Sequence, residues 1–600
     1  MPIYHAPLDD IGFVLDEVID AGELANWPGY ADATPEMIGS ILGEAAKLCE
    51  KVLLPLNQTG DVEGCTFDRG EIRTPRGFRE AYRRFCEGGW TGLSCKTEYG
   101  GQGLPLLLNF VVDEMICSAN MSFGMYPGLS HGAYNAIDKH GEESLKRIYL
   151  PKLVEGIWAG TMCLTEPQSG TDLGLVRTKA EPRPDGSYGI TGNKIFISAG
   201  EHDLAENIIH LVLARLPDAP SGIRGISLFL VPKYLPRSDG SSGNRNQVAC
   251  VGIEHKMGIK GSATCAMNFD GATGWLVGKP HKGMSAMFTM MNEARLGVGM
   301  QGLGIAEIAY QNAVAYAKER LQGRALTGPA YPDKPADPLI VHPDVRRNLL
   351  TMKALIEGSR ALAFLVGKKL DAEAKHPDPA ARAEAADFVS LMTPVIKAFL
   401  TDVGFDVANL AMQIYGGHGY IRDNGIEQYV RDSRIAQIYE GANGIQALDL
   451  VGRKMAEDYG RLLRSFFKPA TAFMAAEKDN PDLADFLPHF MSAFGKLQVA
   501  SLTVATRGFG NPNEAGAAAS DYLRMFALVA LGLMWLKMAK VAGAKLRAEP
   551  KTEPERAAFY EAKLKTARFY FDKIMPQVNA LNLAILSGAK SVMDMPEAAF

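Results

Sequence analysis

The sequence predicts an α+β fold of several domains, with helices first, then strands, then helices twice more. Apolar residues recur at helical spacing over most of the chain, whereas short apolar runs separated by turns gather in residues 159–279. A length of 600 residues, at about 150 residues per domain, suggests three or four domains. Because strands and helices do not alternate and no glycine-rich phosphate loop follows a strand, a doubly wound nucleotide-binding sheet is not expected.

The composition excludes several classes of protein. Apolar residues make up 47% and charged residues 22% of the chain, which is ordinary for a globular protein, and the net charge is −5. This balance gives no broad basic face for nucleic acid or for an anionic membrane. The eight cysteines include no CxxC pair, so we expect reduced thiols, no zinc site and no other bound metal.

The first 158 residues are predicted to form a leader, 1–35, and an α-helical domain, 36–158. Pro35 begins the first amphipathic pattern, and Thr34 before it suits an N-cap. The glycine-rich segment 90–105 must be a loop. Further helices are expected near residues 76–90, 105–120, 128–140 and 143–155.

Residues 159–279 are predicted to form a β-barrel or a β-sandwich, because several short strands follow one another with turns between them. The stretch 188–198 is predicted to be two strands joined by a Gly-Asn turn. Residues 236–247, rich in Ser, Gly and Asn, are expected to be a flexible loop. The other strands are expected at 159–165, 207–215, 225–231 and 263–269.

The helical period returns after residue 280 and predicts two more helical domains, 280–460 and 468–600. A proline-rich loop at 327–343 interrupts the first of them. The helices are expected near residues 284–320, 344–373, 383–413, 443–460, 484–507, 514–545 and 553–587.

The most apolar run of the chain, 525–536, lies between Arg524 and Lys537. This run alone is too short to cross a bilayer. We therefore expect a buried core helix, with a surface membrane anchor as the alternative. Neither a transmembrane segment nor a signal peptide is expected, and the predicted location is cytoplasmic.

One carboxylate late in the third predicted domain has a setting that suits catalysis. Glu440 follows Ile438 and Tyr439 and precedes Gly441 and Ala442. Apolar surroundings raise the pKa of a carboxyl group and favour general-base work, and a glycine lets a ligand approach the backbone. The alternative is a Glu in the first turn of a helix, where the helix dipole favours it.

Five sequence blocks resemble blocks of the acyl-CoA dehydrogenase family and follow one another in the same order as in that family. The first reads Cys-Leu-Thr-Glu-Pro-Gln-Ser-Gly-Thr-Asp, and the last is the glycine-rich stretch that ends around Glu440. Any one block could arise by chance, whereas five in the family's order are highly specific. Their positions are 163–172, 194–198, 254–265, 292–296 leading to 316–320, and 413–446, within a span of about residues 36–455.

The resemblance implies an α-helical N-terminal domain, a middle β-barrel and a C-terminal four-helix bundle. The leader and the additional helical domain are similar to those of a long subgroup of the family. The implied cofactor is FAD, and the implied substrate is an acyl-CoA, either 3-methylthiopropanoyl-CoA or a fatty acyl-CoA. The resemblance also implies electron-transfer flavoprotein as the electron acceptor and a homodimer as the assembly.

Within this resemblance, Glu440 is the base that removes the α-proton of the thioester. The β-hydrogen leaves as a hydride to N5 of FAD, and the product is a trans-2-enoyl-CoA. Because the α-proton is weakly acidic, the family also gives two hydrogen bonds to the thioester oxygen. One comes from the backbone N–H of the base, here Glu440, and the other from a ribityl hydroxyl of the flavin.

The resemblance assigns further residues to the cofactor and the substrate. Taken alone, Phe196 would be a strand core residue and Arg295 a helix-surface arginine. The implied FAD contacts are Met162, Leu164, Thr165, Thr171, Phe196, Ser198, Arg320, Gln413, Gly416, Gly417 and Ala442. The resemblance implies that Arg320 reaches the pyrophosphate, and Gln413, Gly416 and Gly417 the adenosine half, of the FAD of a neighbouring subunit. The implied acyl-CoA contacts are Thr171, Asn292, Arg295 and Gly441, with residues 121–126, Ser130 and His131 at the acyl end.

The chain departs from the family's pattern at several positions, including Thr171 in place of a Ser and Ser198 in place of a Thr. Phe196 replaces a Trp, which keeps an aromatic face and removes an N–H donor. The run that begins at Arg320 reads Arg-Leu-Gln-Gly, so it lacks the Phe of the family's Arg-x-x-Phe-Gly. Ala442 stands in place of a Thr and Ala447 in place of an Arg.

Two alternatives remain open from the sequence. An acyl-CoA oxidase would perform the same first half-reaction and pass the electrons to O₂. A DNA-binding or assembly protein of the same fold would need a basic surface, whereas residues 461–600 mix basic and acidic side chains.

Overall fold

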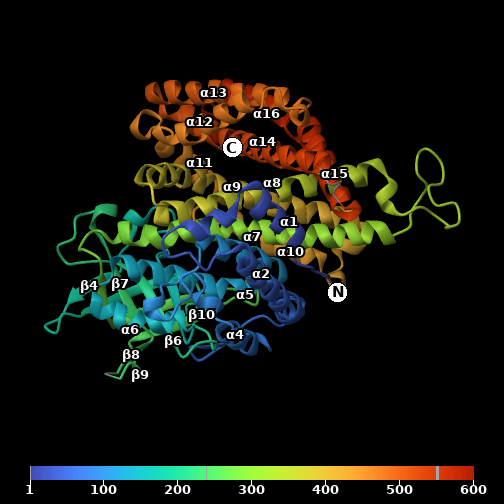
Figure 1. Ribbon diagram of the computed structural model, residues 1–600. Helices are drawn as coiled ribbons and strands as arrows, with labels where there is room; N and C mark the ends of the chain where they lie inside the picture. Colours follow the sequence, from blue (N-terminus) through green and yellow to red (C-terminus); the bar gives the residue numbers. More distant parts are fainter. Residues whose placement is uncertain (1, 238, 549–552) are drawn as a thin grey trace. The chain divides into compact units, whose positions relative to one another are not determined.

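The computed structural model describes residues 2–237, 239–548 and 553–600 (Figure 1). The chain forms two compact units. The barrel unit comprises Glu44–Leu104 and Met115–Gly297, and the bundle unit comprises Met1–Gly43, Pro105–Glu114 and Val298–Phe600. The boundaries of the predicted domains stay predictions.

Five strands of the barrel unit close into a ring, which confirms the predicted β-barrel. The strands pair in the order β11–β5–β4–β6–β7, and β7 pairs again with β11. Two more strands extend the sheet, β3 (Trp158–Cys163) parallel to β6 and β10 (Val248–Ile253) antiparallel to β11. Buried side chains such as Val212 and Phe229 fill the core. The ring consists of β4 (Lys179–Pro182), β5 (Tyr188–Ser198), β6 (Asn207–Arg215), β7 (Ile226–Pro232) and β11 (Thr264–Val277).

Two of the sequence predictions for the barrel were wrong. Residues 188–198 form one continuous strand, β5, rather than two strands around a turn. A Cβ on Gly192 within β5 would fall 2.4 Å from the hydroxyl oxygen of Thr178, so this glycine permits a close approach and makes no turn. The predicted flexible loop 236–247 contains part of a hairpin, β8 (Tyr234–Pro236) with β9 (Ser242–Arg245).

The two helices predicted at 105–120 and 128–140 are one helix, α5 (Leu106–His140), with a kink at Asn120. The Asn120 side chain accepts from the backbone N–H of Phe123 at 3.0 Å and donates to the carbonyl oxygen of Leu53 at 3.2 Å. The amide therefore caps the helix again after the kink. Two other helices of this unit, α4 (Phe78–Glu87) and α6 (Glu143–Val154), lie where they were predicted, whereas α3 (Asn57–Glu63) was not predicted.

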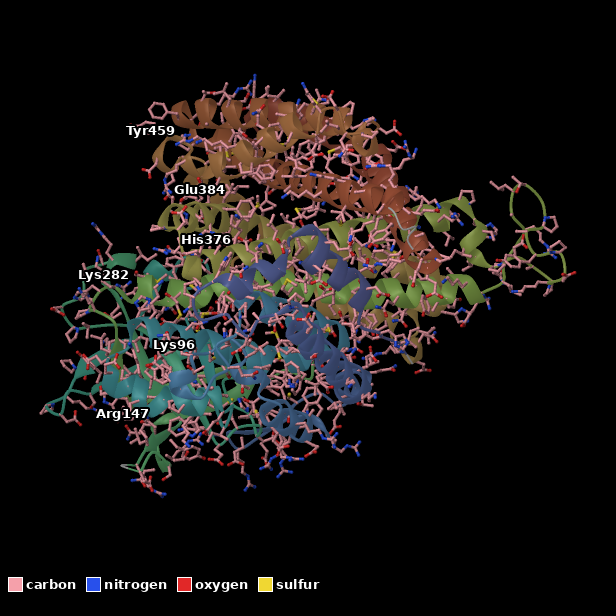
Figure 2. The ribbon with its side chains drawn as sticks, viewed as in Figure 1. Lys96, Arg147, Lys282, His376, Glu384 and Tyr459 are labelled. Carbon is pink, nitrogen blue, oxygen red and sulfur yellow. The ribbon has the colours of Figure 1, made fainter. Side chains whose placement is uncertain are left out.

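The glycine-rich segment 90–105 is a loop with short turns, as predicted. Lys96, which is labelled in Figure 2, fastens this loop to α5. Its backbone N–H donates to the hydroxyl of Tyr134 at 2.9 Å, and its ammonium group donates to Asp138 at 2.8 Å.

The bundle unit is built on long helices, as predicted. Thr34 accepts from the backbone N–H of Met37 at 3.3 Å at the start of α2 (Pro35–Leu48), as expected of an N-cap. The helix α8 packs along α9, and the shorter α10 and α11 also pack on α9. The bounds are α7 (Gly283–Glu319, of which the part from Val298 belongs here), α8 (Pro343–Lys375), α9 (Pro379–Tyr415), α10 (Ile426–Arg434) and α11 (Asn443–Asp449).

The last part of the bundle unit is helical, and α13, α14 and α16 lie side by side (Figure 1). The helix predicted at 553–587 is two helices, because Pro576 ends the first stretch. The helices are α12 (Arg461–Ala476), α13 (Leu487–Gly510), α14 (Pro512–Arg547), α15 (Pro554–Phe569), α16 (Gln577–Leu586) and α17 (Lys590–Met593).

The apolar run 525–536 is a buried core helix, but the argument from its length was wrong. It lies within α14, which has 36 residues and is long enough to cross a membrane. Among the described residues, three helices are long and apolar enough to cross a membrane. In each of them, 83% of the apolar 18-residue stretch is buried within the protein. Trp535 on α14 donates from its indole nitrogen to the carbonyl oxygen of Ala354 on α8 at 3.1 Å.

Candidate active site

The predicted base lies in a strained turn of the bundle unit. Glu440 has φ +55° and Gly441 has φ +87°, and a left-handed backbone is uncommon for any residue other than glycine. Helix α11 begins at Asn443, so Glu440 precedes the helix and the alternative of a helix first-turn Glu is wrong. Such outliers gather at active sites, where the surrounding structure holds them in place.

Two polar side chains of α11 hold this turn. The amide nitrogen of Asn443 donates to the carbonyl oxygen of Ala398 at 3.1 Å and to Asp402 at 2.8 Å, both on α9. The amide oxygen of Asn443 accepts from Lys397 at 2.9 Å. Gln446 donates to the carbonyl oxygen of Glu440 at 3.2 Å, so the backbone of the base is fixed directly.

The surroundings of Glu440 are only partly apolar. Glu440, Gly441 and Ala442 are half-buried and Ile438 is 50% exposed. The neighbouring Tyr439 donates from its hydroxyl to Gln301 on α7. The turn is therefore rigid and open on one face, which a ligand can cover.

The turn after β3 carries Leu164 and Thr165 in the barrel unit, and a buried ion pair fixes it. The carbonyl oxygen of Thr165 accepts from the backbone N–H of Ile195 on β5 at 2.9 Å. Lys194 on β5 donates to the carbonyl oxygen of Leu164 at 3.0 Å and to Glu166 at 2.8 Å. Both charged side chains are almost fully buried. The sequence blocks contain Lys194 and Glu166, but their pairing was not predicted.

Several hydrogen bonds keep Glu166 ionised. Burial by itself would raise its pKa, but the Lys194 ammonium and hydrogen bonds from Thr178 and from the N–H of Arg177 lower that pKa to about 2. Beyond the turn, Glu166 and Ser169 exchange two backbone hydrogen bonds of 2.9 Å. This closed loop leaves Thr171 exposed.

Phe196 is 59% exposed on β5 and has φ +57°, so it is not the strand core residue that the isolated sequence suggested. Ser198, two residues later, pairs with Thr264 of β11, and Met162 lies half-buried on β3. An exposed aromatic ring on a strained strand offers a flat apolar face to a planar ligand.

Arg295 is 8% exposed, so it is not a helix-surface arginine. Its guanidinium lies 3.5 Å from the amide oxygen of Asn292, one turn earlier on α7, and over the ring of Phe288 at 5.9 Å from the centroid. Two of the predicted acyl-CoA contacts thus lie together in the barrel unit.

His131 belongs to a hydrogen-bonded network in the barrel unit. Its Nδ1 contacts Glu293, whose second oxygen accepts from Asn135 at 2.5 Å, and its Nε2 lies 2.8 Å from the hydroxyl of Ser94. Burial by itself would lower the pKa of His131, but the Glu293 carboxylate raises it well above its usual range. The order Ser-His-Glu is that of a hydrolase triad, but a pKa raised in this way disfavours the neutral imidazole that would take a serine proton. The network therefore clamps α5 to α7.

The polar groups at the predicted acyl end take part in folding. The hydroxyl of Tyr126 donates to the carbonyl oxygen of Gly261 at 3.1 Å and accepts from the N–H of Ala263 at 3.0 Å. The hydroxyl of Ser130 accepts from the N–H of Gly160 on β3 at 3.0 Å. These contacts anchor α5 to β3 and to the residues just before β11, a role that the sequence did not reveal.

An open cavity of about 580 Å³ in the bundle unit contains three of the predicted cofactor residues, Arg320, Gly416 and Gly417. Gln413 is exposed on the last turn of α9, nearby in the chain, but does not line the cavity. A Cβ on Gly416 or Gly417 would meet nothing within 4 Å, so the backbone is open to a ligand. The other lining residues are Tyr316, Gln322, Leu339, Ile414, Tyr415, His418 and Ile421.

Two stacked tyrosines form one wall of this cavity. The rings of Tyr316 and Tyr415 lie 4.1 Å apart at 15°, and the hydroxyl of Tyr316 lies 3.0 Å from Nδ1 of His418. An aromatic face, a guanidinium and open backbone amides suit a purine and phosphate oxygens. The residues therefore fit the adenosine half of FAD, and no group of His, Cys, Asp and Glu among the described residues suits a metal.

Four family models match the chain. The acyl-CoA dehydrogenase N-terminal, middle and C-terminal domains match residues 40–157, 161–272 and 281–455. A domain described as "acetyl-CoA dehydrogenase C-terminal like" matches residues 466–596.

Relatives match the chain over its whole length. The 3-methylmercaptopropionyl-CoA dehydrogenase of Ruegeria pomeroyi is 41% identical over 98% of this chain and 99% of its own length. A butyryl-CoA dehydrogenase of Syntrophomonas wolfei is 36% identical over 100% of this chain and 99% of its own length.

The fold is also found among solved structures. The acyl-CoA dehydrogenase from Bacillus anthracis complexed with FAD has a TM-score of 0.74 and 21% identity, over 96% of this chain and 91% of that one. The family models and the end-to-end relatives agree with the barrel and the helical bundle found here. The chain therefore belongs to the acyl-CoA dehydrogenase family, whose cofactor is FAD.

Proposed function

We propose that this FAD-dependent enzyme dehydrogenates 3-methylthiopropanoyl-CoA or a fatty acyl-CoA to the trans-2-enoyl-CoA, with Glu440 as the base. The turn at Glu440–Gly441 carries the proposal, because a strained, half-buried carboxylate is held there by Asn443 and Gln446. The 41% identity to a 3-methylmercaptopropionyl-CoA dehydrogenase supports the methylthio substrate.

In this proposal Glu440 accepts the α-proton of the bound thioester. An acyl chain that covers the open face of the turn excludes water from the carboxylate, which makes it a stronger base toward that proton. The backbone N–H of Glu440 donates to the thioester oxygen, where negative charge develops. Bound FAD supplies the acceptor for the β-hydride.

The barrel unit supplies the surfaces for the flavin and for CoA. Phe196 and the turn at Leu164–Thr165 present an aromatic face and a backbone edge to the flavin ring. Arg295, with Asn292 beside it, offers a guanidinium for the CoA phosphates.

The electron acceptor that we propose is electron-transfer flavoprotein, in a cytoplasmic homodimer. An oxidase that uses O₂ is the second candidate, and comparable rates of peroxide release and of dye reduction would favour it. The non-enzymatic alternative is disfavoured, because relatives matched end to end are named dehydrogenases.

A substrate panel tests the proposal. The purified protein is mixed without air with 3-methylthiopropanoyl-CoA, butyryl-CoA and longer acyl-CoA thioesters, and the flavin absorbance is followed. We expect bleaching that is fastest with one of these thioesters. Absence of bleaching with every thioester would refute the proposed activity.

A further inference from the structure

The cavity at Arg320, Gly416 and Gly417, called the adenosine cavity below, has an unusual wall, because the phenylalanine that the family places three residues after Arg320 is absent. Two side chains that line the cavity near that place are Gln322 and Leu339. Leu339 directly follows the segment 324–338, which belongs to the connection between α7 and α8, and begins a short 3₁₀ helix, Leu339–Val341.

A short antiparallel contact fixes Leu339 beside Arg320. Leu321 forms a β-bridge with Pro338. The backbone N–H of Leu339 donates to the carbonyl oxygen of Arg320 at 2.9 Å, and the N–H of Gln322 donates to the carbonyl oxygen of Asp337 at 2.9 Å. These bonds join the two ends of the segment next to the cavity.

The interior of the segment is organised around one buried carboxylate. Asp337 is 0% exposed and accepts from the backbone N–H groups of Ala325, Ala330 and Tyr331 at 2.8–3.0 Å. Arg324 adds a contact of 3.3 Å to the same carboxylate. A carboxylate with this many donors holds a long connection in one conformation, so the position of Leu339 is set by the whole segment.

We propose that the segment 324–338 is a cofactor-binding element, which places Leu339 and Gln322 as the wall of the adenosine cavity where the family has phenylalanine. This inference rests on the binding of FAD by the proposed enzyme. Leu339 gives the purine an apolar contact in the cavity that the stacked Tyr316 and Tyr415 also line, and Gln322 gives it an amide for hydrogen bonds.

The test is the affinity of the stripped apo-protein for FAD and for FMN, measured by flavin fluorescence. Leu339→Ser is compared with Leu326→Ser, the same change in the same connection between α7 and α8, at a side chain that is 87% exposed. We expect Leu339→Ser to weaken FAD binding about tenfold and Leu326→Ser to change it less than twofold. FMN binding should stay within twofold in both variants, because FMN has no adenosine.

Asp337→Asn provides a second variant that keeps the shape of the side chain and removes its charge. We expect it also to weaken FAD binding about tenfold with unchanged FMN binding. The inference would be overturned if Leu339→Ser and Asp337→Asn both bound FAD as tightly as wild type. It would also be overturned if these variants lost as much affinity for FMN as for FAD. A wild-type protein that binds no FAD would instead refute the proposed function.

Discussion

At the scale of single residues, the site depends on how the backbone around Glu440 is held. The identity of the base followed from sequence blocks, because its neighbours match a family pattern. Its left-handed conformation could not be predicted, since the hydrogen bonds that hold it involve Asn443, Gln446 and residues of α9 that lie up to 46 positions before Asn443 in the chain. Phe196 is a similar case, because a strand residue with φ +57° cannot be recognised from alternation of apolar residues.

Replacement of Asn443 by Ala tests whether this turn positions the base. The change removes the bonds to Lys397, Ala398 and Asp402 and should cost about 1–3 kcal/mol of stability. We expect kcat to fall about tenfold to a hundredfold, because small displacements of a catalytic group have effects of this size. Steady-state kinetics measures kcat, and the flavin content of each protein is measured separately so that kcat refers to enzyme that contains FAD.

The control for this variant is Asn511→Ala, which removes the cap of α14, a bond from the N–H of Asn513 at 3.1 Å. This control should lose about 1 kcal/mol of stability and keep its kcat. If Asn443→Ala retained the wild-type kcat, the turn would not position the base.

At the scale of elements, the order of strands and helices followed from periodicity, and the errors have identifiable causes. Gly192 in β5 looked like a turn residue because a single sequence does not show that Thr178 lies against it. The kinked α5 looked like two helices because Asn120 and Pro127 interrupt the helical pattern. The Lys194–Glu166 pair was not foreseen, because it joins β5 to the turn after β3, which only the barrel brings together.

This ion pair predicts a pH-dependent stability. The pKa of Glu166, about 2 in the fold against an ordinary 4.5, lies below its unfolded value. Its contribution, about 3 kcal/mol, is therefore complete above about pH 4.5 and is lost as the pH falls toward 2. We expect Glu166→Gln to have a lower free energy of unfolding than wild type at pH 6.5. This difference in free energy should narrow between pH 5 and pH 3.

Urea unfolding at several pH values measures this difference. Glu181→Gln, a change at an exposed position of β4, serves as the control and should track the wild type within about 0.5 kcal/mol. If the difference in free energy of unfolding between wild type and Glu166→Gln stayed constant from pH 6.5 to pH 3, the lowered pKa of Glu166 would be contradicted.

At the scale of the whole molecule, the sequence showed a leader and a helical tail but not what joins them. Within the bundle unit, Lys563 on α15 contacts Asp10 of the leader and donates to Glu357 on α8 at 2.8 Å. Burial by itself would raise the pKa of Asp10, but Lys563 holds it below its usual range. The two ends of the chain thus share one buried ion cluster, which no local pattern reveals.

Lys563→Met should destabilise the protein by about 1–3 kcal/mol, because it removes the cation paired with Asp10 and leaves Glu357 with Lys353 alone. The matched control is Lys565→Met on the same helix, where the side chain is 75% exposed and the expected change is within about 0.5 kcal/mol. Denaturant unfolding monitored by circular dichroism compares the two. Similar stabilities for both variants would show that the cluster does not hold the leader to the tail.

The most direct test of the account is the anaerobic reductive half-reaction of Glu440→Gln beside wild type, each with equal bound FAD. With the best thioester of the panel, we predict that flavin bleaching slows by about 10³-fold or more, because proton removal loses its base, while the flavin spectrum before mixing is unchanged. Bleaching of the variant at the wild-type rate would show that another group removes the proton.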